Sequence, residues 1–135
     1  MRADVYLDQI KKIDLIIINK RDDYKRWVDI ATGLGSFSDS ERVKSSSNPQ
    51  KIPNAIIKYV DIEREIDELK RKRAEIIKTI ERLPSAEYMV IYSLYVEGYT
   101  LKEISYRYKK SYEWAKKKKQ RGLMLIQRII DEVKP

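Results

Sequence analysis

The residues with the clearest chemistry lie in a basic stretch near the end of the chain. Residues 100–123 read TLKEISYRYKKSYEWAKKKKQRGL, in which four successive lysines precede Gln120 and Arg121 and follow Tyr112 and Trp114. Lysine and arginine bind phosphate groups, and glutamine can pair with the edge of adenine. These residue types therefore indicate binding to a polyanion.

The same stretch predicts two short helices joined by a sharp turn. Thr100 is a favourable N-cap and Glu103 completes a capping box, so the first helix should run from Thr100 to about Tyr108. Ser111 should cap the second helix, which continues past Leu123. The positions at which two crossed helices would share a small core are Leu101, Ile104, Ala115 and Leu123. This outline predicts a helix-turn-helix, whose second helix enters the major groove of DNA.

For double-stranded DNA as the partner, we expect one face of the second helix to meet the groove. Gln120 would read adenine, the lysines would meet guanine or phosphate, and residues at the turn would position the backbone. The predicted DNA-binding residues are Lys110, Ser111, Tyr112, Glu113, Lys116, Lys117, Lys119 and Gln120. Two alternatives stay open: a solvated lysine-rich helix, and a Trp114 that packs in the core instead of contacting DNA.

Charge and composition favour this class of partner and disfavour an enzyme. The formal net charge is +8, and residues 84–135 carry 11 Lys and Arg against 6 Asp and Glu. The sequence has no Cys and no His, which excludes zinc fingers, thiolate chemistry and a His-based triad. It also lacks a phosphate-binding glycine loop, a nucleophile elbow and an HExxH motif. We therefore expect no catalytic residue, no metal site and no cofactor.

The expected location is the cytoplasm of a bacterial host cell, without membrane association. The longest apolar run near the N-terminus, at 15–18, is far too short to span a bilayer. The first residues, MRADVYLDQIKK, are charged throughout and lack the apolar centre of a signal peptide.

Two long helices are expected over residues 3–34 and 54–83, each with a coiled-coil seam. The first seam comprises Ala3, Tyr6, Ile10, Ile13, Ile17, Tyr24, Trp27, Ala31 and Leu34. The second comprises Ala55, Tyr59, Ile62, Ile66, Leu69, Ile76, Ile80 and Leu83. Gly33 and Gly35 should end the first helix, and Asn54 should cap the second. Between them, 35–53 is expected to be a loop with a solvated or phosphate-contacting role.

The equal length of the two seams predicts an antiparallel helical hairpin, so the fold class is all-α. Ile16, Ile18 and Val28 widen the apolar face beyond the needs of one hairpin. We therefore expect a homo-oligomer, with a dimer favoured, because dimers commonly read two DNA half-sites.

A second domain is expected to follow Pro84, which divides the chain into a hairpin, 1–83, and a DNA-binding domain, 84–135. Ser85 should cap an apolar support helix that Gly98 ends. The residues after Gly122 that should face inward, towards this helix or another subunit, are Leu123, Ile126, Ile129, Ile130 and Val133.

The region from Leu83 onward resembles the promoter-reading C-terminal domain of bacterial sigma factors. The shared pattern is an apolar helix, Gly98, the run TLKEI from Thr100, and a second helix that ends in RGL. With the words ERV and SSNPQK in the loop 35–53, the whole chain resembles phage late-gene regulators of the ArpU and RinA type.

This resemblance implies a DNA-binding activator of phage or prophage late or packaging genes. Three positions depart from the usual motif: Ser105 replaces Ala, Lys109 replaces Gly, and Ala115 replaces a larger core residue. Lys109 must then be left-handed or the turn must differ. One alternative is a sigma-like adaptor or antagonist that contacts RNA polymerase or another regulator. Another is the DNA-recognition subunit of a packaging machine.

Overall fold

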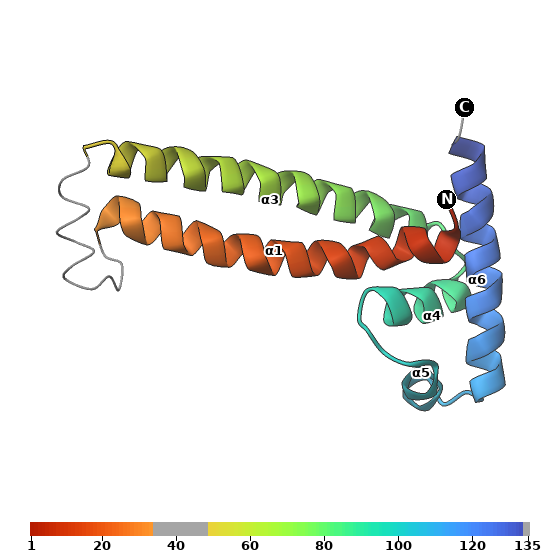
Figure 1. Cartoon of the computed structure of the whole chain (residues 1–135). Helices are drawn as coiled ribbons and strands as arrows, with labels where there is room; N and C mark the ends of the chain where they lie inside the picture. Colours follow the sequence, from red (N-terminus) through yellow and green to blue (C-terminus); the bar gives the residue numbers. More distant parts are fainter. Residues whose placement is uncertain (34–48, 134–135) are drawn as a thin grey trace. The chain divides into compact units, whose positions relative to one another are not determined.

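The computed structural model describes residues 1–33 and 49–133, and within these ranges it contains helices and no strand. The helices are α1 (Ala3–Thr32), α3 (Lys51–Glu81), α4 (Ser85–Tyr95), α5 (Leu101–Arg107) and α6 (Tyr112–Val133) (Figure 1). The predicted all-α fold is confirmed. Leu34 and residues 35–48 of the expected loop lie outside the described residues. In the described ranges, no helix has both the length and the apolar character required to cross a membrane.

The chain forms two compact units, Asp14–Lys70 and Met1–Ile13 with Arg71–Pro135. We predicted a division at Pro84, whereas here the start of α1 and the end of α3 belong with the C-terminal helices. The physical reason is burial, because Leu7 and Ile10 on α1 and Ile80 on α3 have no exposed surface. The seam analysis did not include Leu7.

In the unit Asp14–Lys70, α1 and α3 run in opposite directions. Lys20 forms an ion pair with Glu65, and the rings of Tyr24 and Tyr59 meet edge to face at 5.7 Å. The buried seam residues of this unit are Ile17, Ala55 and Ile66. Ile18 does not widen the core of this chain, because 54% of its surface is exposed.

Two of the predicted helix caps are wrong. α3 begins at Lys51, and the N–H of Asn54 donates to the Gln50 carbonyl at 2.9 Å, so Asn54 is already inside the helix. Pro53 fits in the first turn of α3 because the N–H groups of that turn have no acceptor within the helix, so no helical hydrogen bond is lost at proline. At α4 the N-cap position is Pro84, and no side chain, Ser85 included, makes a capping hydrogen bond.

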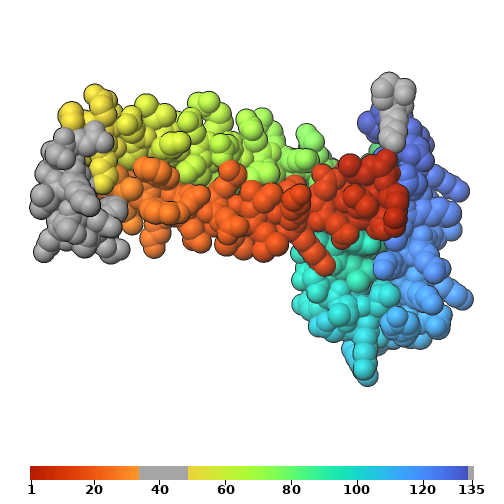
Figure 2. Space-filling model, in the orientation of Figure 1, coloured from red at the N-terminus to blue at the C-terminus, as the bar shows by residue number. Residues whose placement is uncertain are grey.

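In the unit Met1–Ile13 with Arg71–Pro135, Gln127 of α6 holds the start of α1. Its Oε1 accepts from the Ala3 N–H at 2.8 Å, and its Nε2 donates to the Met1 carbonyl at 3.0 Å. Figure 2 shows the first residues, in red, against α6, in blue. Ile126 beside this clamp is fully buried, as expected, whereas Val133 is 76% exposed and does not face inward in this chain.

Candidate nucleic-acid interface

A turn and a capping box connect α4 to α5, next to the candidate interface. Gly98 has φ +80°, and after it the Tyr99 N–H donates back to the Ser93 carbonyl at 2.9 Å. The Thr100 hydroxyl then accepts from the Glu103 N–H at 3.2 Å, and the Glu103 carboxylate accepts from the Thr100 N–H at 3.1 Å. The predicted capping box is confirmed, and it fixes where α5 begins.

The turn between α5 and α6 is a Schellman arrangement with a lysine at its left-handed position. Lys109 has φ +53°, its N–H donates to the Tyr106 carbonyl, and the Lys110 N–H donates to the Ser105 carbonyl at 2.9 Å. Of the two alternatives for Lys109, the left-handed one is therefore correct. The predicted cap of α6 is also confirmed, because the Ser111 hydroxyl accepts from the Trp114 N–H at 3.0 Å.

A small apolar core holds α4, α5 and α6 together. Its buried residues are Val90, Ile104 and Ala115, and the half-buried residues packed against it are Leu94, Leu101, Tyr108 and Trp114. Trp114 thus packs against this core but is only half-buried, so its contact with DNA stays a prediction. Leu123, expected in this core, is half-buried outside the cluster. The core fixes α6 against its two neighbours.

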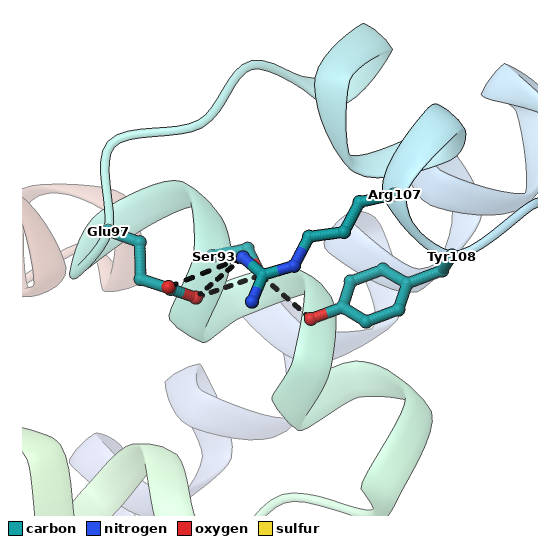
Figure 3. A network of polar contacts seen from close by, with 4 residues as sticks. All are labelled: Ser93, Glu97, Arg107 and Tyr108. Atoms are coloured by element: carbon teal, nitrogen blue, oxygen red, sulfur yellow. Dashed lines mark hydrogen bonds and ion pairs between the residues drawn. The ribbon is translucent and has the colours of Figure 1, made fainter.

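A polar network joins α4 to the C-terminal end of α5 (Figure 3). The Arg107 guanidinium lies 3.3 Å from the Glu97 carboxylate and 5.0 Å from the ring centre of Tyr99. The Ser93 hydroxyl lies 3.3 Å from that of Tyr108. The hydrogen bond with Glu97 raises the pKa of Arg107 above its ordinary value. This network engages Arg107 within the unit and helps to fix α5 on α4.

The residues predicted to bind DNA lie at the N-terminal half of α6 and just before it. Those with exposed side chains are Lys110, Ser111, Tyr112, Glu113, Lys116, Lys117 and Gln120, while Lys119 is half-buried. Glu113, Lys117 and Gln120 recur at helical spacing, so they share the side of α6 that faces away from Ala115. Lys110 also lies over the Trp114 ring, at 5.7 Å from its centre. The structure therefore brings seven of the eight residues to an exposed surface.

Sequence reasoning missed two exposed residues on α5 and one buried residue on α4. Lys102 and Tyr106 are one helical turn apart on the outer side of α5, and Tyr106 is 74% exposed. Each lies two residues from buried Ile104, on the opposite side of the helix, and this spacing could have predicted that they are exposed. On α4, the buried Glu87 carboxylate pairs with Lys118 and Arg121. No sequence pattern linked these three residues.

Searches of protein-family models, curated proteins and solved structures find no match to this chain.

Proposed function

We propose that this protein binds double-stranded DNA in a sequence-specific manner through the N-terminal half of α6. The observation that carries the proposal is the exposed basic surface at Lys116 and Lys117, next to Gln120, on a helix held by a capped turn. Lysines of such a helix meet phosphates, and its polar side chains reach base edges.

The regulatory role that we propose rests on the resemblance to phage late-gene regulators. In this role the protein activates late or packaging genes of a phage or prophage. A dimer would place two copies of α6 on two half-sites. Self-association is supported by large apolar side chains exposed in the unit Asp14–Lys70, namely Leu15, Ile18, Ile52, Ile56, Ile57 and Val60.

A salt titration tests the DNA-binding proposal. Fluorescence anisotropy would follow the full chain and labelled duplexes from phage promoter regions between 50 and 300 mM salt, on the order of the range over which phosphate contacts weaken. The expected affinity falls steeply, with a log–log slope of about −0.9 per phosphate neutralised. No binding at the lowest salt would overturn the proposal and favour a protein-binding adaptor.

A matched pair of variants assigns the surface. Lys116→Ala with Lys117→Ala should weaken binding about tenfold or more, since two phosphate contacts are lost. Lys11→Ala with Lys12→Ala is the control, because these lysines are also adjacent, exposed and helical but lie on α1. Equal effects of the two pairs would show that the charge of the chain, and not this face of α6, governs binding.

A further inference from the structure

The carboxylate of Glu87 on α4 lies between two cations of α6. Its Oε1 is 3.5 Å from the Lys118 Nζ and 3.4 Å from the Arg121 Nε. Only 5% of the Glu87 side chain is exposed, against 30% for Lys118 and 58% for Arg121. A buried carboxylate needs charged partners, so the two cations are tied to α4.

Two features of the fold place Glu87 there. Glu87 lies in the first turn of α4, where the helix dipole favours a negative charge. Opposite it, α6 comes close to α4 at Gly122, where a Cβ would lie 3.7 Å from the Glu87 Cβ. Since Gly122 follows Arg121, the close approach brings the cations of this turn to the carboxylate.

The positions of the lysines in the sequence do not determine which side of α6 meets DNA. Residues 116–119 are four successive lysines, and at about 100° per residue they point to all sides of the helix. Glu87 engages Lys118, Lys119 is half-buried, and Lys116 and Lys117 are exposed.

We infer that Glu87 is a positioning residue that holds Lys118 and Arg121 against α4 and so withdraws them from DNA. This inference rests on the proposed function. Glu87 offsets only one of these two positive charges, but it holds both cations against α4, so neither contacts a phosphate, and binding relies on the remaining cations and on Gln120. Loss of the Glu87 charge frees both cations to meet phosphates of any sequence.

The first test compares Glu87→Gln with Glu75→Gln in the full chain. Both variants remove one negative charge, but Glu75 is exposed on α3. On a duplex of scrambled sequence, Glu87→Gln should steepen the log–log salt slope by about 0.9 for each cation that it frees, and so by about 1.8 at most. It should also bind that duplex more tightly relative to the preferred one. Equal slopes for the two variants would overturn the inference.

A second pair of variants leaves Glu87 in place. Lys118→Gln keeps Arg121 as a partner for the carboxylate, and its slope should equal that of the wild type. Lys117→Gln should have a slope shallower by about 0.9, for one lost phosphate contact. A Lys118→Gln slope as shallow as that of Lys117→Gln would place Lys118 on DNA and contradict the role of Glu87.

A measurement without DNA separates this inference from the proposed function. In NMR spectra of the free chain, Glu87→Gln should shift the Arg121 Nε resonance, because that nitrogen loses its charged partner, whereas Glu75→Gln should leave it in place. If Glu87→Gln leaves the Arg121 resonance unchanged, the inferred role of Glu87 is wrong even if the chain binds DNA. Absence of DNA binding by the wild type would instead reject the proposed function.

Discussion

Gly122 of α6 lies so close to Ile91 of α4 that a Cβ at Gly122 would stand 2.6 Å from the Ile91 Cγ1. Ile91 is fully buried, so its side chain cannot move out into solvent. Gly122→Ala gains about 1 kcal/mol of helix propensity but overpacks the junction at a cost of about 1–3 kcal/mol. We expect a net loss of up to about 2 kcal/mol in the free energy of unfolding, measured by urea denaturation.

The cause of that loss is tested by repeating Gly122→Ala in a chain that also carries Ile91→Ala. With the isoleucine side chain removed, Gly122→Ala should cost less than it does in the wild type, or should even stabilise the chain. The same cost in both backgrounds would show that the contact with Ile91 is not responsible.

Leu7 and Val5 of α1 should respond differently to truncation to alanine. Leu7 has no exposed surface and belongs to the unit that holds α6, whereas 48% of Val5 in the same unit is exposed. Leu7→Ala should lower the free energy of unfolding by about 2–5 kcal/mol, and Val5→Ala should stay within about 0.5 kcal/mol. Comparable losses for both variants in thermal or urea unfolding would contradict the burial of Leu7 in this unit.

Local signals predicted much of the candidate interface. The capping box of Thr100 and Glu103, the cap at Ser111 and the turn at Gly98 each depend on partners within a few residues, so the sequence contains the whole interaction. Seven of the eight predicted residues at α6 are exposed, whereas the predicted contact residue Lys119 is half-buried. The expectation that Lys109 takes a left-handed conformation or changes the turn came from the resemblance, because Gly is usual at this position of the motif.

Contacts between distant residues were not predictable in this way. Gln127 and Ala3 are separated by 124 residues, and Lys118 and Glu87 by 31. Each contact forms only because the helices fold back on one another. No local sequence pattern links the two residues of either pair. The predicted boundary at Pro84 differed for the same reason, since Leu7 and Ile80 bury their side chains in the unit that contains α6.

The two wrong helix caps both involve a proline. Asn54 follows Pro53 and Ser85 follows Pro84, and each polar residue looked like a cap because proline usually marks a boundary. Proline is also well tolerated in the first turn of a helix, and this second property decides the start of α3.

The central claim is that the exposed face at the N-terminal half of α6 meets the duplex. The most direct measurement is an NMR titration of the isotope-labelled full chain with a promoter-region duplex at low salt. We predict that the largest shifts occur at Lys110, Ser111, Tyr112, Glu113, Lys116, Lys117 and Gln120, with little change at the exposed Lys11 and Lys12 of α1. Shifts centred on α1 and α3, or no shift at any residue of α6, would contradict the claim.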